Sequence, residues 1–187
     1  MVLMDRLASE NILSADNQQE RLQKISPWYI SGFVDGEGTF HVSFARRKDL
    51  PRKWAIIPEF HISQHQDRAS VLNEIQTYFG CGIIRENHRG RTNDVTRVLV
   101  VRNRRDLLDK IIPFFRRYPL RSQKRDDFRI FAEIVLEMEQ GNHQSNEGFH
   151  SIVKKAFQMN GGGRYRKRKI EEFSKESSET TRQSSIQ

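Results

Sequence analysis

The stretch from Ser26 to Gly38, with the sequence SPWYISGFVDGEG, most constrains how this chain can fold. It predicts a short helix, because Ser26 suits the N-cap, Pro27 suits the first turn, and Gly38 tolerates the backbone that a helix C-terminus requires. Gly32 and Gly36 lie four residues apart on one face, although each glycine costs a helix roughly 1 kcal/mol. We therefore expect another backbone to pack closely against this face.

Two carboxylates stand at the end of the same helix. Asp35 and Glu37 lie where the helix dipole already supplies negative charge, which costs a few tenths to ~1 kcal/mol unless a cation joins them. A divalent metal is the natural cation for such a pair.

The segment from Ile30 to Gly38, ISGFVDGEG, resembles the signature of the LAGLIDADG homing endonucleases. Relative to that signature, Ile stands in place of the first Leu, Ser in place of Ala, and Glu in place of the final Asp. The signature occurs once. The resemblance implies that two such helices pack side by side, here from two chains, and that the last acid of each copy holds a catalytic metal over DNA.

Composition fits a soluble protein with a polyanionic partner. The chain of 187 residues is most simply one domain, with 36% hydrophobic residues, 30% charged residues and a formal charge of +8. A basic globular protein without a nucleic-acid partner could have the same charge. Cys81 is the only cysteine, which excludes an intramolecular disulfide and a Cys-rich zinc site and suits a reducing compartment. We expect no membrane contact and an intracellular location, organellar or in a bacterial or archaeal cytoplasm.

Hydrophobic periodicity predicts an α+β fold. It indicates a second helix capped by Asp67 and stopped by Gly80, and a third helix interrupted by Pro113. Strands are expected at 40–45, 56–63, 83–86 and 95–101, and further helices at 123–140 and from Asn146. This αββαββα order, followed by extra C-terminal helices, looks like the LAGLIDADG core fold with its saddle-shaped antiparallel sheet. The resemblance covers residues 28–138.

The expected domain boundaries follow from composition. Residues 1–25 are predicted to form an N-terminal arm, 26–160 a single domain and 161–187 a basic, largely disordered tail. The cluster RYRKRK at 164–169 suits phosphate contact or simple solubility.

The active-site residues are assigned through the resemblance. Glu37 is the predicted ligand of Mg²⁺ (or Mn²⁺), with the Gly36 carbonyl as a second ligand; a surface carboxylate or a helix-end ion pair is the alternative for Glu37. Gln64 would hold water and Arg68 would offset phosphate charge, unless they are only a strand-end polar residue and an ion-pair partner of Asp67. Lys124 is the predicted basic residue of the active site, where it would stabilise the transition state or organise solvent, with Arg121 and Arg125 as the alternatives.

Two binding surfaces are also predicted. The dimer interface would use Gly32, Phe33, Asp35 and Gly36. The polar face of the sheet and its loops would enter the DNA major groove, where donors and acceptors distinguish the bases. The predicted DNA-binding residues are His41, Ser43, Arg46, Arg47, Lys48, Arg52, Lys53, Ile57, Glu59, His61, Arg85, Asn87, Arg89 and Arg91.

These residues favour a sequence-specific double-strand DNA endonuclease. It would act as a homodimer on a long pseudo-palindromic site and hydrolyse both strands with a divalent metal, leaving short 3′ overhangs as the family does. An RNA maturase that binds its host intron RNA, a catalytically silent DNA-binding protein and a basic globular protein are the alternatives.

Overall fold

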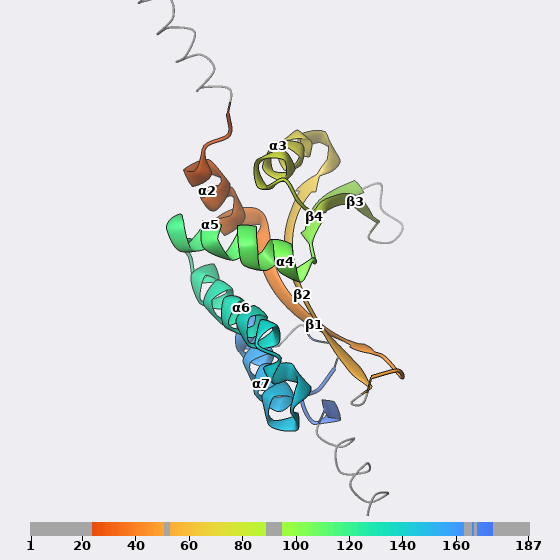
Figure 1. The fold of residues 1–187 in the computed structure, drawn as a ribbon. Helices are drawn as coiled ribbons and strands as arrows, with labels where there is room; N and C mark the ends of the chain where they lie inside the picture. Colours follow the sequence, from red (N-terminus) through yellow and green to blue (C-terminus); the bar gives the residue numbers. More distant parts are fainter. Residues whose placement is uncertain (1–23, 51–52, 89–94, 163–165, 167, 174–187) are drawn as a thin grey trace, which may run out of the picture.

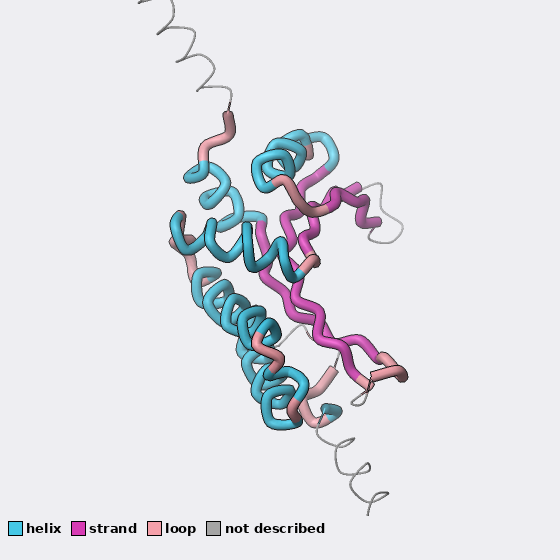
Figure 2. The backbone as a smooth tube through the Cα atoms, in the orientation of Figure 1, coloured by secondary structure: helices cyan, strands magenta, loops and turns pink. Residues whose placement is uncertain are grey.

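The computed structural model describes residues 24–50, 53–88, 95–162, 166 and 168–173. It shows a four-stranded antiparallel sheet with helices packed against it, so the predicted α+β class is confirmed (Figures 1 and 2). No helix in these ranges is both long and apolar enough to cross a bilayer. The elements, in chain order, are α2 (Pro27–Glu37), β1 (Gly38–Arg46), β2 (Trp54–His65), the 3-10 turn η1 (Gln66–Arg68), α3 (Ser70–Phe79), β3 (Ile83–His88), β4 (Val95–Val101), α4 (Arg104–Asp106), the π turn η2 (Leu107–Ile111), α5 (Ile112–Arg117), α6 (Lys124–Glu139), the 3-10 turn η3 (Asn142–Gln144) and α7 (Asn146–Gly162).

The sheet has the strand order β1-β2-β4-β3, built from the two predicted hairpins. β2 pairs with β1 along its length, but with β4 only from Phe60 to His65. Pro58 faces Val42 of β1 and lies outside the β4 ladder, so its missing N–H interrupts no pairing on that side. Pro58 therefore lies where one side of β2 has no neighbouring strand in the described part of the chain.

The core lies between the sheet and the helices. Phe40 of β1 is fully buried at its centre. Its ring lies 5.1–5.4 Å, centroid to centroid, from four other rings, those of Phe60, Phe115, Phe128 and Phe131. Since these rings come from β1, β2, α5 and α6, the cluster fixes the helices to the strands that follow α2.

The predicted beginning of α2 is confirmed, but the reason for Gly38 differs. Ser26 is the N-cap and Pro27 the first helical residue. Gly38 has an ordinary extended backbone, with φ −85°. A Cβ at this position would lie 2.8 Å from the backbone oxygen of Val34, so glycine is required here by close packing. Gly80, in contrast, ends α3 in the left-handed conformation, with φ 57°, as a helix stop should.

Two predictions about helix boundaries were wrong. Asp67 does not cap α3: it lies in η1, whose cap is His65, and α3 begins at Ser70. Pro113 does not break its helix, because a π turn precedes it and the proline occupies the first turn of α5, where a missing N–H costs no hydrogen bond.

The packed structure continues past residue 160, where the sequence analysis ended the domain. Phe173 is buried, and its ring lies 4.8 Å from those of Trp54 and Phe44 at the distal end of the β1–β2 hairpin. Arg166 is not free for phosphate: its guanidinium donates to the carbonyls of Val42, at 2.8 Å, and Ala156, at 2.6 Å. The predicted tail is therefore in part a C-terminal strap across β1 and α7. Residues 1–23 of the predicted arm and 174–187 of the tail lie outside the described residues.

Candidate active site and nucleic-acid interface

The end of α2 presents an exposed carboxylate. Glu37 is exposed, and within the described ranges its side chain makes no hydrogen bond or ion pair. The helix-end ion pair weighed as its alternative is therefore absent from this part of the chain. The carboxylate is open to a ligand from outside the chain.

Lys124 binds the last carbonyl groups of the same helix. Its Nζ donates to the carbonyls of Val34 at 2.9 Å, Asp35 at 2.8 Å and Gly36 at 3.3 Å. Burial lowers the pKa of Lys124, while the nearby carboxylates of Asp35 and Glu37 act to raise it. A cation here complements the negative end of the helix dipole, so Lys124 lies beside the predicted centre, as expected from its position in the sequence.

Asp35 has a different role from that of Glu37. Its carboxylate accepts hydrogen bonds from the backbone N–H of Arg121 at 2.7 Å and from the N–H and hydroxyl of Ser122 at 3.2 and 2.7 Å. Burial alone would raise its pKa, but these hydrogen bonds and Lys124 give a lowered pKa. Asp35, predicted at the dimer interface, thus holds the loop before α6 against α2 within its own chain and thereby positions Lys124.

A second contact joins α2 to this loop. Ser31, which replaces the alanine of the family signature, is buried and donates to the carbonyl of Tyr118 at 2.9 Å. The buried hydroxyl is therefore hydrogen-bonded, and an alanine at this position could not form this bond. The serine thereby links α2 to Tyr118, the C-cap residue of α5.

The donors at the end of α2 fit a hard divalent cation. Mg²⁺ prefers oxygen ligands and typically binds one or two carboxylates, water and substrate phosphates. Glu37 supplies one carboxylate, and the Gly36 carbonyl retains a lone pair beside its 3.3 Å contact with Lys124. No cluster of three or more metal-ligating His, Cys, Asp or Glu side chains occurs among the described residues. The described residues of one chain thus supply only some of the oxygen ligands that such a cation would need.

Gln64 and Arg68 lie beyond the last pairs of β2 with β1. Because Ile62 pairs with Gly38, the first residue after α2, Gln64 lies two residues past the start of β1. Its side-chain oxygen accepts from the N–H of His65 at 2.9 Å. The ion pair weighed for Arg68 is not formed, since Asp67 instead contacts His65 at 3.2 Å. Arg68 is exposed and makes no contact that would compete for a phosphate in the described structure.

The glycine face of α2 is exposed. A Cβ added to Gly32 or Gly36 would meet nothing within 4 Å, so no part of the described chain packs there. Tyr29, 53% exposed, stacks on Phe33 beside these glycines at a centroid distance of 6.0 Å. The close packing expected from two helix-weakening glycines must therefore come from outside the described residues.

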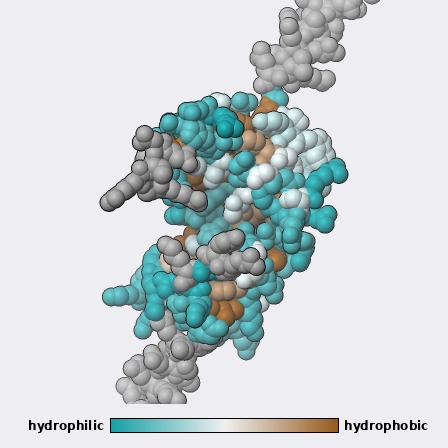
Figure 3. Space-filling view, turned by 180° about the vertical axis from the view of Figure 1, so that it is seen from behind, coloured by the Kyte–Doolittle hydropathy of each residue, from teal (hydrophilic) through white to brown (hydrophobic). Residues whose placement is uncertain are grey.

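The outer face of the sheet carries the predicted DNA-facing residues. His41 and His61 are partly buried neighbours, with ring centroids 6.4 Å apart, and burial lowers the pKa of each. Arg85 and Asn87 of β3 are exposed. Seen from the side opposite to Figure 1, the surface is mainly hydrophilic with small apolar patches (Figure 3). Ser43 and Ile57 pair across β1 and β2, and the Ser43 hydroxyl donates to the Ile57 carbonyl at 3.4 Å.

Glu59 departs from its prediction. Its position opposite His41 is on the expected face, but only 6% of the residue is exposed, so it is not open to a base. Its carboxylate accepts from Nε of Arg102 and lies 3.4 Å from the His61 ring. Arg102, directly after β4, was missed. Its side chain is 58% exposed, and its place two residues after Val100 on the same face could have identified it.

The β1–β2 loop is basic, as predicted, although not all of its cations are free. Arg46 stacks over the ring of Trp54 at 4.5 Å. Arg47 forms a bidentate salt bridge with Asp49, in which Nε and Nη2 donate to the two carboxylate oxygens at 2.8 and 2.6 Å. This contact lowers the pKa of Asp49 to about 2. Lys48 and Lys53 are exposed. Arg52, Arg89 and Arg91 lie outside the described residues.

Known proteins match both the sequence and the fold. The LAGLIDADG endonuclease profile matches residues 30–135. The homing endonuclease I-ApeII of Aeropyrum pernix is 32% identical over 79% of this chain and 87% of its own length. A probable intron-encoded endonuclease of Neurospora crassa is 31% identical over 74% of this chain, which spans 25% of that relative.

Solved structures show the same fold. The homing endonuclease I-TnaI is 34% identical, with a TM-score of 0.70, over 84% of this chain and 99% of its own. Meganuclease I-SmaMI, solved with uncleaveable DNA, is 31% identical, with a TM-score of 0.68, over 73% of this chain and 45% of its own. A single helix with the signature ISGFVDGEG, its exposed glycines and its terminal carboxylate lies inside the matched region. The chain belongs to the LAGLIDADG endonuclease family.

Proposed function

We propose that this protein is a sequence-specific endonuclease that cuts both strands of DNA as a homodimer and depends on Mg²⁺ or Mn²⁺. The observation that carries the proposal is the end of α2. There an unpaired carboxylate, Glu37, lies on the same helix as an exposed face that contains two glycines.

The proposed dimer would complete the metal site. Close approach of two α2 helices across Gly32 and Gly36 would bring together the two copies of Glu37, which lies one residue past the second glycine. Two carboxylates, two Gly36 carbonyls and the DNA phosphates supply the hard oxygen ligands that Mg²⁺ requires. A two-fold axis between the helices also explains why such a chain would favour a pseudo-palindromic site.

The side chains around Glu37 fit phosphodiester hydrolysis. A bound divalent cation would lower the pKa of a water molecule and neutralise charge on the phosphate. Gln64 can orient a water through its amide, and Arg68 can donate to a phosphate oxygen. Lys124 keeps the helix end in place and adds positive charge next to the reacting group. Water is the attacking group in this scheme, so no covalent enzyme intermediate forms.

The DNA partner is supported by the sheet and by the relatives. The outer face carries exposed donors such as Arg85 and Asn87, which can read base edges in a major groove. I-SmaMI, which shares the fold, was solved with DNA. With its charge of +8, the chain would also gain affinity for a duplex through release of counterions.

Digestion of a randomised duplex library tests the proposal. With Mg²⁺, sequencing of the cut ends should reveal one pseudo-palindromic site and short 3′ overhangs; chelation of the metal should abolish cutting. Glu37→Gln should abolish cleavage but retain duplex binding, whereas Glu74→Gln, at an exposed carboxylate of α3, should cut normally. Cleavage by Glu37→Gln would refute the metal-ligand assignment. Tighter binding to structured RNA than to duplex DNA would instead support a maturase.

A further inference from the structure

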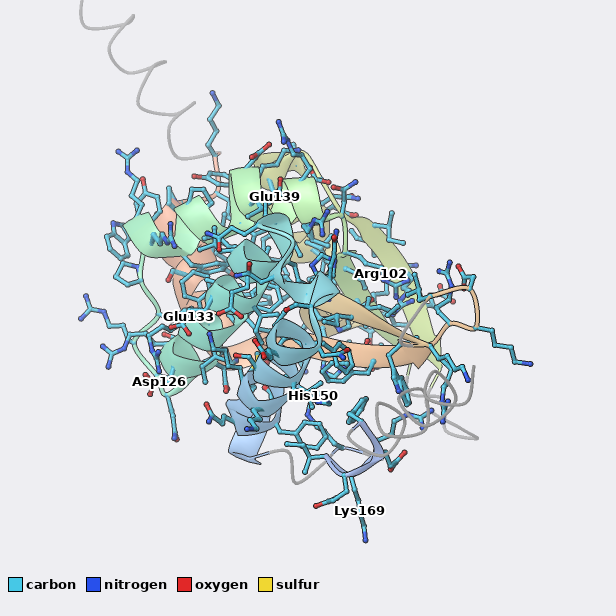
Figure 4. All side chains as sticks on the ribbon, turned by 60° about the horizontal axis from the view of Figure 1, so that its bottom comes forward. Arg102, Asp126, Glu133, Glu139, His150 and Lys169 are labelled. Atoms are coloured by element: carbon cyan, nitrogen blue, oxygen red, sulfur yellow. The ribbon has the colours of Figure 1, made fainter. Side chains whose placement is uncertain are left out.

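On the outer face of the sheet, a buried carboxylate is paired with an exposed guanidinium. Glu59 is 6% exposed, whereas the side chain of Arg102 is 58% exposed. The two are joined through Nε of the guanidinium, which is its inner edge. This is the only hydrogen bond or ion pair of Arg102 within the described residues. Figure 4 places Arg102 beside the strands, apart from Asp126 and Glu133 of α6.

This arrangement orients Arg102 before any ligand binds. A buried carboxylate is costly unless it is paired and hydrogen-bonded, so Glu59 holds the guanidinium firmly. The side-chain entropy that an arginine normally loses on binding is thereby reduced. The two terminal nitrogens are the end of the guanidinium farther from Glu59. Arg102 also lines a hollow of about 250 Å³, together with Ile83, Arg85 and Val100.

The chemistry of an oriented guanidinium selects one base. Guanine presents two acceptors, N7 and O6, on its major-groove edge, and arginine binds them with two parallel hydrogen bonds. Adenine presents a donor in place of one of these acceptors, and cytosine also presents a donor. Either base would therefore place an N–H donor against an N–H donor of Arg102, which forms no hydrogen bond. A lysine, whose ammonium group rotates freely, would bind a phosphate or another base acceptor nearly as well as guanine, because it cannot form two parallel hydrogen bonds of fixed geometry.

We propose that Arg102, held by Glu59, reads one guanine in each half of the DNA target, with Glu59 as its positioning residue. The inference rests on the proposed function, because it requires that the outer face of the sheet enters a major groove. It adds a specificity residue that lies outside the predicted DNA-binding set. It also gives Glu59 a role that does not need contact with DNA.

Binding to the selected target and to all of its single-base variants tests the inference. Affinities are measured in chelator, so that cleavage does not consume the DNA, and at one fixed salt concentration. The wild type should prefer guanine about ten- to hundredfold at one symmetric pair of positions. Arg102→Lys, which keeps the cation beside Glu59, and Arg102→Ala should both lose that preference and keep the preferences elsewhere. Glu59→Gln should weaken the same preference without moving it.

Arg97→Ala is the matched control. Arg97 lies on β4, the strand that Arg102 follows, and it pairs with the exposed carboxylate of Glu86 at 3.6 Å. Its removal should leave the guanine preference unchanged, because Arg97 lies on the face of β4 opposite that of Val98 and Val100. Thermal unfolding of each variant identifies any change that follows from misfolding, and Arg102→Lys carries the test if Glu59→Gln or Arg102→Ala fails to fold.

The outcomes separate this inference from the proposed function. If the wild type selects a duplex site but Arg102→Lys keeps its full base profile, the guanine assignment is wrong and the endonuclease proposal stands. The same follows if the lost preference is for a base other than guanine. If the wild type shows no sequence preference on duplex DNA, both proposals fail.

Discussion

Replacing Lys124 by methionine should weaken the end of α2 as well as the chemistry. The substitution removes three hydrogen bonds from Nζ, to the carbonyls of Val34, Asp35 and Gly36, at 2.8–3.3 Å. A hydrogen bond to a charged group contributes about 1.5–3 kcal/mol when buried, and a cation at a helix C-terminus about 0.3–1 kcal/mol. Because Lys124 is only partly buried, water will replace much of this, and we expect a loss of about 1–2 kcal/mol.

Thermal unfolding followed by circular dichroism measures this loss. For a chain of this size, about 1 kcal/mol corresponds to a shift of about 2–4 °C in Tm, so Lys124→Met should melt about 2–8 °C below the wild type. Lys110→Met is the matched control, since Lys110 also binds a helix-end carbonyl, that of Gly80 at 2.9 Å, and lies on the π turn η2. An unchanged Tm for Lys124→Met would refute the structural part of the argument.

Cleavage measured well below both Tm values separates stability from chemistry. At such a temperature both variants are folded, so Lys110→Met should cut DNA like the wild type. Lys124→Met should lose at least tenfold in rate, the lower range for a positioned catalytic group. Full cleavage by Lys124→Met would show that the lysine serves only the helix end.

Three further perturbations follow from the structure. Gly38→Ala should lower the free energy of unfolding in urea by about 1–3 kcal/mol, because its Cβ would lie 2.8 Å from a backbone oxygen. Gly36→Ala, with nothing within 4 Å of its Cβ, should leave the stability of the monomer unchanged but weaken the proposed dimer, which analytical ultracentrifugation would measure. Burial lowers the pKa values of His41 and His61, so below pH about 6.5 the unfolded state binds more protons than the folded state. The free energy of unfolding should therefore fall as the pH drops from 7 through the folded pKa values. A urea midpoint that stays constant between pH 7 and pH 5 would contradict this. Phe173→Ala should lower the free energy of unfolding by about 3–5 kcal/mol and make the distal β1–β2 hairpin sensitive to limited proteolysis. If the variant resists proteolysis as well as the wild type does, the C-terminal strap is not required there.

The sequence alone was sufficient where the signal is local. Ser26 and Pro27 mark the start of α2, Gly80 marks the end of α3, and alternating residues mark the strands, because each depends on the conformation of a few consecutive residues. The signature ISGFVDGEG, together with the predicted order of helices and strands, identified the family. These local signals also gave the order of the elements, which the sheet confirms.

The tertiary structure alone decided the partners of the functional side chains. Asp35 and Lys124 meet at the end of α2 although they lie 89 residues apart, and Arg166 binds β1 across 124 residues. Strand phase placed Glu59 on the outer face, but only packing against Arg102 shows that it is buried. Backbone periodicity indicates which face a residue occupies, whereas burial and pairing depend on side chains that the fold brings together from distant parts of the chain.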